Sequence, residues 1–332
     1  MTATNTVTKY HGILIEQPGE ADVLQYKSLE LPSPPAGHVK VEIHAAGLNF
    51  IDIYQRRGTY KVELPFTPGR EAAGIVVEVG DGVSDFKAGD RVAYAHGLGG
   101  YAEYANVEAN FLIHLPEKIS FIDGAAFPLQ GMTAHYLIHE FHEIKPGETV
   151  LIHAAAGGMG LILTQWAKKL GARVFGTVSS DKKAQLAKAA GADEIIFYTE
   201  KDFAKEALRL TDGKGVDMII DGVGKTTFPL DLEAIKLRGD IVIYGSASGP
   251  AEPVGPNTFQ LKSVSVHGGS LFNFIREKEE LQMRANAVLK AMEEGWLKLR
   301  IEQVLPLQDA AKAQKLLEGR ETTGKLVLKV RD

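Results

Sequence analysis

The stretch that decides the fold is VLIHAAAGGMG, residues 150–160, followed by LILTQWAKKLG, residues 161–171. Val150–His153 is typical of a buried strand, and Leu161–Leu170 reads as an amphipathic helix that Gly171 closes. The residues between them are almost all Ala and Gly. A strand, a turn of small residues and a helix in this order predict the first half of a strand–helix–strand unit.

The turn carries a nucleotide-binding pattern, A-x-x-G-x-x-G, in which Ala154, Gly157 and Gly160 take the key positions of G-x-G-x-x-G. A small first residue permits the tight turn, Gly157 lets the backbone approach a pyrophosphate, and Gly160 lets the helix pack against the strand. The N–H groups at the start of the following helix suit phosphate oxygens. Alone the pattern is weak, because small residues are common in any strand-to-helix turn.

The residues that follow make the pattern specific, because short apolar runs alternate with amphipathic helical runs. The predicted strands are Val150–His153, Val174–Val178, Ile195–Tyr198, Val216–Asp221 and Ile241–Tyr244, and the predicted helices between them are Leu161–Leu170, Lys182–Ala190, Asp202–Leu210 and Thr226–Leu237. Ser263–His267 adds a strand at one edge. This alternation predicts an α/β fold with a doubly wound parallel sheet of the Rossmann type, and therefore dinucleotide binding.

The residues before this unit predict a different architecture. Val39–His44, Gly74–Val79 and Arg91–Ala95 read as strands separated by close Gly and Pro turns, which indicates a mostly antiparallel, barrel-like domain. A helix is expected over Thr133–Ile144. The last part adds a helix at Glu277–Glu294, a strand at 304–306, a helix at Asp309–Leu317 and a terminal strand at Lys325–Lys329. We therefore predict two domains, residues 1–132 with 271–332, and residues 133–270, as a length of 332 residues also suggests.

The end of the second predicted strand indicates which dinucleotide binds. NAD sites place an acidic side chain about 20 residues beyond the glycine pattern, to hold the ribose hydroxyls. Here Ser179 or Ser180 stands at that place, which leaves room for a 2′-phosphate, and Lys183 follows one helical turn later. Asp181 is expected at the helix N-cap. The pattern favours NADPH over NADH. The alternative interpretation is that Lys183 is only a solvated charge on the helix.

Composition excludes some classes of chemistry. The chain has no cysteine, so disulfides, thiol catalysis and thiolate zinc sites are impossible. A net charge of −5 gives no reason to expect nucleic-acid binding. The first ten residues are polar, and no stretch reaches the roughly 20 apolar residues that span a membrane, so a cytoplasmic protein without membrane partners is expected.

At Gly69-Arg70-Glu71 and Asn49-Phe50-Ile51-Asp52 the chain resembles the medium-chain dehydrogenase/reductase superfamily, and the resemblance covers essentially the whole length. It implies a GroES-like domain followed by the Rossmann domain. In the zinc-dependent members a Cys opens one of these motifs and a His stands inside the other. This chain has Asn49 and Arg70 there, which supply neither the thiolate nor the imidazole that catalytic zinc requires, so no metal is expected.

The chain is more closely similar to the zinc-free, zeta-crystallin-like quinone reductases, in the stretches 47–52, 153–158, 165–168 and 170–172. The resemblance implies that Asn49 and Tyr54 approach the nicotinamide, with Tyr54 as a possible proton donor. It also implies a set of cofactor-binding positions: Asn49, Thr133, Ala154, Gly157, Gly158, Met159, Gly160, Ser179, Lys183, Tyr198, Gly245, Ser246 and Arg320. Asn49 and Asp52 capping a helix, and Tyr54 as ordinary packing, are the alternative interpretations.

The expected function is the reduction of quinones by hydride transfer from NADPH without a metal. A reductase of α,β-unsaturated ketones or aldehydes is the alternative, and a non-catalytic protein that binds NADPH or RNA is a third. The resemblance further implies a homodimer through the edge strand Ser263–His267. A metal site at His135, His139 and His142, which would share one face of a helix, is a weaker hypothesis, and His153 is expected to reflect only backbone placement.

Overall fold

The computed structural model describes residues 7–319 and 322–331. These residues form two compact units. Unit 1 consists of the described residues up to Leu129 together with Ile275–Ala285 and those from Ile301 onward, and unit 2 consists of Gln130–Phe274 and Asn286–Arg300. The domain limits expected from the sequence, residues 1–132 with 271–332 and residues 133–270, stay a prediction about how the chain divides into folding domains.

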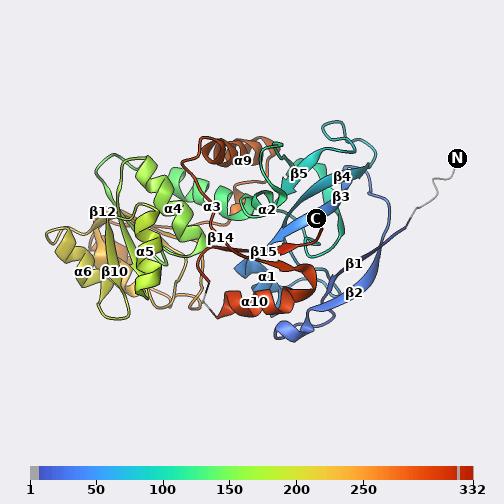
Figure 1. The fold of residues 1–332 in the computed structure, drawn as a ribbon. Coiled ribbons are helices and arrows are strands. Elements are labelled where there is room, and N and C mark those ends of the chain that lie inside the picture. The colour runs from blue at the N-terminus through green and yellow to red at the C-terminus, as the bar shows by residue number, and fades with distance from the viewer. Residues whose placement is uncertain (1–6, 320–321, 332) are drawn as a thin grey trace. The chain divides into compact units, whose positions relative to one another are not determined.

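Unit 1 is built on a mostly antiparallel sheet (Figure 1). Its strands follow the order β14-β15-β3-β4-β5-β7, β6 pairs with β3, and β1 and β2 form a separate antiparallel pair. β14 and β15 are parallel to each other. The strands are β1 (Thr8–Leu14), β2 (Gln25–Leu31), β3 (His38–Gly47), β4 (Glu71–Val79), β5 (Arg91–Tyr94), β6 (Tyr104–Glu108), β7 (Ile113–His114), β14 (Ile301–Pro306) and β15 (Lys325–Lys329). This confirms the expected GroES-like domain.

Short helices accompany this sheet: α1 (Phe50–Arg56), α2 (Phe121–Gly124) and α10 (Ala310–Glu318), with 3-10 turns at Ala21–Val23, Ala109–Phe111 and Leu307–Asp309. The helix α9 (Lys278–Glu293) belongs to unit 1 as far as Ala285 and to unit 2 beyond it. α1 follows β3 directly, so the residues at its start are positioned by a strand in the middle of the sheet.

Unit 2 contains a six-stranded, all-parallel sheet of order β10-β9-β8-β11-β12-β13. The strands are β8 (Thr149–Ile152), β9 (Arg173–Val178), β10 (Glu194–Phe197), β11 (Val216–Asp221), β12 (Ile235–Ile243) and β13 (Ser265–Gly268). The helices are α3 (Pro128–His139), which belongs to unit 2 from Gln130 onward, α4 (Gly158–Lys169), α5 (Asp181–Ala189), α6 (Phe203–Leu210), α7 (Phe228–Ala234) and α8 (Asn257–Gln260), with a 3-10 turn at Leu271–Asn273. The strand order is the doubly wound one expected from the alternation, and it confirms the Rossmann fold.

Every residue of β8 is buried, as in a parallel sheet that is covered on both faces. α4 and α5 pack on each other and on β8, β9 and β10, whereas α6 and α7 pack on each other and on β10, β11 and β12. Within the described residues, no helix is long and apolar enough to cross a membrane.

Two helix predictions are wrong in their limits. The helix expected at Thr133–Ile144 is α3, which begins at Pro128, where the first helical turn tolerates a proline, and ends at His139. The helix expected at Thr226–Leu237 stops at Ala234 because Ile235 starts β12. Ile235 is fully buried and pairs with Val216 of β11, so sheet pairing decides its conformation.

Candidate cofactor and reaction site

The candidate cofactor site lies in unit 2, at the edge where its parallel strands end. Dinucleotides bind at this carboxyl edge of open α/β sheets, where the order of the strands reverses. The order β9-β8-β11 places that reversal beside β8, whose end leads into the glycine-rich turn. The structure therefore brings the predicted pattern to the expected place in the fold.

The turn after β8 has the geometry that the pattern predicted. Ala154 has a φ of 50°, a left-handed conformation that a small residue tolerates best. A Cβ atom on Gly160 would lie 2.4 Å from the carbonyl oxygen of Ala154, so only glycine lets α4 pack this close to the strand end. Gly157 is the N-cap of α4, and the N–H groups of the first helical turn have no partner within a helix. These features fit a dinucleotide pyrophosphate.

The next two strands place two of the predicted 2′-phosphate positions, Ser179 and Tyr198, near each other. Ser179 follows β9, and the N–H of Tyr198, just beyond β10, donates to the carbonyl oxygen of Val178 over 3.2 Å. Tyr198 is therefore next to the end of β9, and about half of its surface is exposed. Lys183 lies in the first turn of α5 and is half-buried. The predicted N-cap Asp181 is wrong by one residue, since Ser180 is the cap in extended conformation and Asp181 opens the helix.

Three further predicted positions belong to unit 2 as well. Gly245 and Ser246 follow β12, and the neighbouring Ala247 N–H donates to Gly222 O in the loop after β11. Thr133 is buried within α3. Arg320, the fourth predicted contact of the 2′-phosphate, lies outside the described residues.

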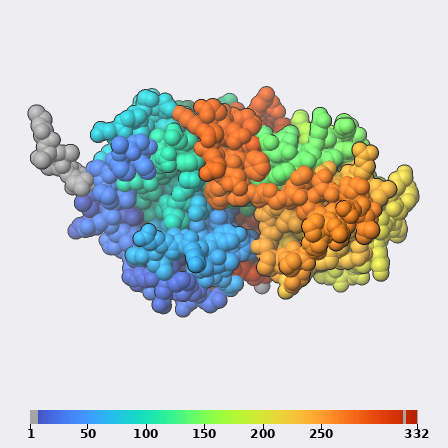
Figure 2. Space-filling view, turned by 180° about the vertical axis from the view of Figure 1, so that it is seen from behind, coloured from blue at the N-terminus to red at the C-terminus, as the bar shows by residue number. Residues whose placement is uncertain are grey.

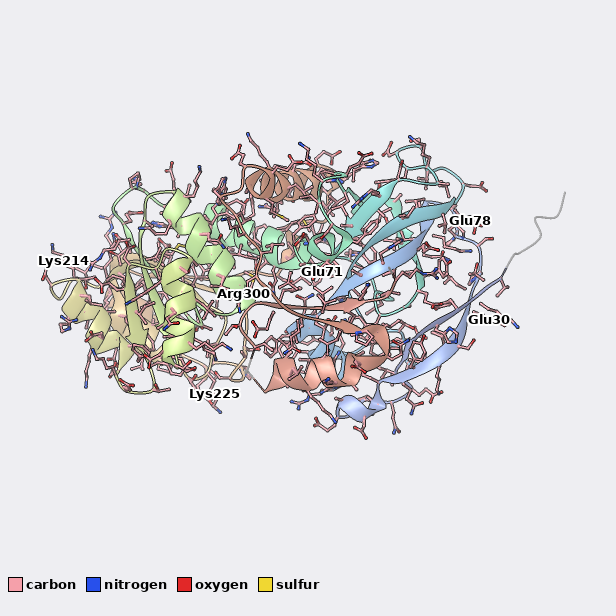
Figure 3. All side chains as sticks on the ribbon, in the orientation of Figure 1. Glu30, Glu71, Glu78, Lys214, Lys225 and Arg300 are labelled. Carbon is pink, nitrogen blue, oxygen red and sulfur yellow. The ribbon has the colours of Figure 1, made fainter. Side chains whose placement is uncertain are left out.

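In unit 1, a buried polar cluster joins Asn49, Glu71 and Lys325. The ammonium of Lys325 donates to Asn49 Oδ1 over 2.8 Å and to Glu71 Oε2 over 2.5 Å. Asn49 Nδ2 donates to the same Glu71 oxygen over 2.9 Å, and the N–H of Leu129 donates to Glu71 Oε1 over 2.6 Å. Figure 3 labels Glu71 at the start of β4. The orientation of the Asn49 amide is therefore fixed by an ion pair.

Asp52 extends this cluster along α1. Its Oδ2 accepts hydrogen bonds from the Asn49 N–H and the Tyr101 hydroxyl, both over 2.9 Å. Burial raises the pKa of Asp52 to about 6, against the opposing effect of these two hydrogen bonds. The contact with the Asn49 N–H is the one that a helix cap makes, so Asp52 does cap α1. Asn49 is the N-cap residue of this capping box, and its side-chain amide also bonds to Lys325 and Glu71.

The other predicted residues of unit 1 lie nearby in the chain. Tyr54 is half-buried on α1, with its ring centroid 6.2 Å from that of Phe50 and 5.3 Å from that of Tyr60. Arg70 precedes β4, and its burial lowers the pKa of the guanidinium while the carboxylate of Asp52 raises it. Asn49 and Arg70 are the positions at which the resemblance implies that zinc ligands are missing, and the expectation of no metal there stays a prediction.

The three histidines of the weaker metal hypothesis do not share one helix face. His135 and His139 lie on α3, with ring centroids 4.7 Å apart, and both rings pack edge-on against Trp166. His142 lies beyond the end of α3, where its ring nitrogens bond to Asp240 and Glu148, each over 2.9 Å. That hypothesis is therefore wrong in its geometry.

The sequence does not predict the bonding partners of three buried residues near the candidate sites. In the sequence Glu71 stands out only as part of a motif and Lys325 only as the start of a predicted strand, although a lysine at the head of an apolar strand is itself a signal. His153 was expected to be incidental, yet it is fully buried and bonds to Asp231 over 2.8 Å. None of these partners is close in the sequence.

The chain matches two known family models. Residues 35–117 match the alcohol dehydrogenase GroES-like domain, and residues 158–288 match the model described as zinc-binding dehydrogenase. Fold and matches together define a dehydrogenase/reductase of the medium-chain class.

Relatives define the branch of that class. A quinone oxidoreductase of Pseudomonas aeruginosa is 42% identical over 93% of this chain and 96% of its own length. The structure of Escherichia coli quinone oxidoreductase complexed with NADPH has a TM-score of 0.94 at 41% identity and covers 96% of this chain and 100% of that one. A 2-haloacrylate reductase of Burkholderia is 38% identical over 95% of this chain and 97% of its own length. The chain belongs to the zeta-crystallin-like quinone oxidoreductases of the medium-chain dehydrogenase/reductase superfamily.

Proposed function

We propose that this protein is an NADPH-dependent quinone oxidoreductase. The observation that carries the proposal is the nearly full-length similarity to quinone oxidoreductases, one of them solved with NADPH, combined with the glycine-rich turn at the switch point of the sheet. NADPH, when bound, supplies the hydride. The protein binds and orients the cofactor and the acceptor, and it keeps water from the reacting atoms.

The N-terminal turn of α4 and the Gly157–Gly160 backbone are proposed to hold the pyrophosphate, with Ala154, Gly158 and Met159 shaping the turn. Ser179, Lys183, Tyr198 and Arg320 are proposed to bind the 2′-phosphate, and Thr133, Gly245 and Ser246 to line the remaining cofactor surface. Lys183→Ala should raise the KM for NADPH about tenfold and leave the KM for NADH nearly unchanged, as expected for one lost charge-assisted contact. Lys182→Ala, which removes the exposed neighbouring charge, is the matched control.

Asn49 and Tyr54 are proposed to act on the nicotinamide and the acceptor. Tyr54 can donate a hydrogen bond or a proton to the oxygen that gains charge as the quinone is reduced. Tyr54→Phe keeps the ring contacts with Phe50 and Tyr60 and removes only the hydroxyl, so a catalytic role predicts a fall in kcat with little change in KM. Tyr60→Phe is the control, and equal kcat values for both variants would contradict the role of Tyr54.

The acceptor is tested by NADPH oxidation with 1,4-benzoquinone, 9,10-phenanthrenequinone, an alkenal and 2-chloroacrylate, with NADH in parallel. The proposal expects oxidation with the quinones and preference for NADPH. The similarity to a 2-haloacrylate reductase favours reduction of electron-poor alkenes as the second candidate. Turnover of the alkenal or the acrylate without turnover of either quinone would replace the first candidate by the second.

We also propose a homodimer that pairs at β13, in the segment Ser263–His267 predicted from the sequence. β13 is the last strand in the sheet order, with β12 as its neighbour, and the surrounding segment reaches the surface of unit 2 (orange, Figure 2). Pairing across a two-fold axis would satisfy the backbone groups of this edge. A monomer by light scattering at micromolar concentration would contradict it. The cytoplasmic location expected from the sequence stays a prediction.

A further inference from the structure

Beneath the candidate cofactor loops of unit 2 lies a buried cluster of three titratable side chains, His153, Asp221 and Asp231. Each is at most 2% exposed. One nitrogen of His153 and one oxygen of each carboxylate lie within 4.8 Å of one another. A histidine and two carboxylates this close, away from water, are costly unless a charge or a proton is shared among them.

The cluster is bonded to the backbone of the nucleotide-binding turn. His153 follows β8, and its Nδ1 lies 3.1 Å from the hydroxyl of Thr177 on β9. The same hydroxyl oxygen accepts the N–H of Ala154 over 3.2 Å. Because Ala154 holds a left-handed conformation, this hydrogen bond stabilises the strained first residue of the turn.

Asp221 bonds to the neighbouring loop after β11. Its carboxylate accepts the N–H groups of Val223 and Gly224 over 2.6 and 3.1 Å and the hydroxyl of Thr227 over 2.8 Å. Hydrogen bonds from His153 therefore reach the ends of β8 and β9, and those from Asp221 hold the loop after β11, with the two side chains close together.

Asp231, on α7, is the member of the cluster that has a carboxylate oxygen without a hydrogen bond among the described residues. Its Oδ1 bonds to His153 Nε2, whereas its Oδ2 is buried and has no hydrogen-bond partner among residues 7–319 and 322–331. Burial raises the pKa of Asp231 to about 6, against the opposing effect of His153 and with a further increase from Asp221. Burial, and after it the charge of Asp221, raises the pKa of the Tyr244 hydroxyl, and the ring of Phe203 on α6 packs edge-on against the His153 ring with centroids 4.7 Å apart. Oδ2 is the atom at which a proton would relieve the repulsion between the two carboxylates.

We propose that His153 and Asp231 are positioning residues of the nucleotide-binding loops, and that the cluster takes up a proton when NADPH binds. The inference rests on the proposed NADPH function. Phosphates bound above the cluster add negative charge near two buried carboxylates, and protonation of Asp231 lowers that repulsion. By linkage, the affinity for NADPH then rises as the pH falls through the range in which Asp231 titrates.

Calorimetric titration with NADPH in two buffers of different ionisation enthalpy measures the protons taken up. Asp231→Asn is isosteric and neutral, so near pH 6 we expect it to take up several tenths of a proton less than the wild type when NADPH binds. Near pH 8.5 the two proteins should take up the same small amount. The wild type should gain about twofold to fivefold in NADPH affinity over Asp231→Asn between pH 8.5 and pH 6, which corresponds to a rise of about 0.5–1 unit in the pKa of Asp231 on binding. Glu233→Gln makes the same chemical change at an exposed site on α7 and should match the wild type.

The 2′-phosphate of NADPH also titrates near pH 6, but it is the same in every variant and cancels in the comparison. Thr177→Val removes the hydroxyl without changing charge, so it should weaken NADPH binding severalfold at every pH and leave proton uptake as in the wild type. If Asp231→Asn does not fold, proton uptake by the wild type alone tests the inference. The part of that uptake that belongs to the 2′-phosphate is then measured by phosphorus NMR of the complex and subtracted.

Equal proton uptake by the wild type and Asp231→Asn, or uptake explained entirely by the 2′-phosphate, would overturn the inference. A divalent metal present in equimolar amount in the purified wild type and lost in Asp231→Asn would also overturn it, since the cluster would then be a metal site. Failure of the wild type to bind NADPH at all would instead refute the proposed function.

Discussion

Replacing Lys325 by methionine tests whether the ion pair at the Asn49 cluster stabilises unit 1. Lys325 is 3% exposed and Glu71 is fully buried, so the change leaves a carboxylate without its counter-ion and without water. Removing one partner of a buried pair costs about 3–5 kcal/mol. Glu71 keeps the hydrogen bonds from Asn49 and Leu129, so we expect Lys325→Met to lower the free energy of unfolding by about 3 kcal/mol, the lower end of that range.

Two further variants separate charge from packing. Lys40→Met removes an equally buried ammonium, whose partner Glu78 keeps 39% of its side chain exposed and can be solvated, so its cost should be only about 1 kcal/mol. Combining Lys325→Met with Glu71→Gln removes the carboxylate that the first change leaves without a counter-ion, and we expect at least half of the lost stability to return. Such recovery is the mark of an uncompensated charge.

The assay is urea unfolding followed by circular dichroism and by tryptophan fluorescence. Both tryptophans, Trp166 and Trp296, lie in unit 2, so fluorescence reports that unit while dichroism reports both. Coincident curves permit a two-state free energy, and a shift in dichroism alone means that unit 1 unfolds separately. A loss for Lys325→Met no larger than that for Lys40→Met, or a double variant no more stable than Lys325→Met, would refute the reasoning.

Three shorter predictions concern single residues. Because the pKa of Asp52 is raised to about 6, its contribution to stability is present below pH about 4 and is lost as the pH rises through about 6. In urea unfolding, the wild type should therefore lose up to about 3 kcal/mol of unfolding free energy relative to Asp52→Asn between pH 4 and 7.5. Gly160→Ala should cost about 1–3 kcal/mol in the same assay and weaken NADPH binding measured by calorimetry, because its Cβ would meet the Ala154 carbonyl. Ala154→Gly should raise the thermal midpoint or leave it unchanged, since glycine adopts the left-handed conformation without strain; a clear fall in the midpoint would contradict that.

The sequence by itself determined the fold class, and it predicts where in that fold the cofactor binds. Its signals are local: the period of apolar residues identifies strands and helices, and the glycine pattern is contiguous along residues 154–160. A parallel order then follows from the alternation, because each crossover must return the chain to the same edge. The absence of cysteine and the identities of Asn49 and Arg70 likewise need no structure to argue against a zinc site.

Tertiary structure decided the charges around these motifs. Lys325 meets Glu71 and Asn49 across more than 250 positions of the chain, and His153 meets Asp231 across 78. Tertiary structure also ends α7 at Ala234, because Ile235 pairs with Val216 of the buried strand β11. Hydrogen bonds and ion pairs between distant residues leave no periodic trace in a sequence, because they depend on which strand ends become neighbours. The motif predicts where a dinucleotide binds, whereas tertiary packing decides which distant side chains, such as His153 and Asp231, bond to each other near it.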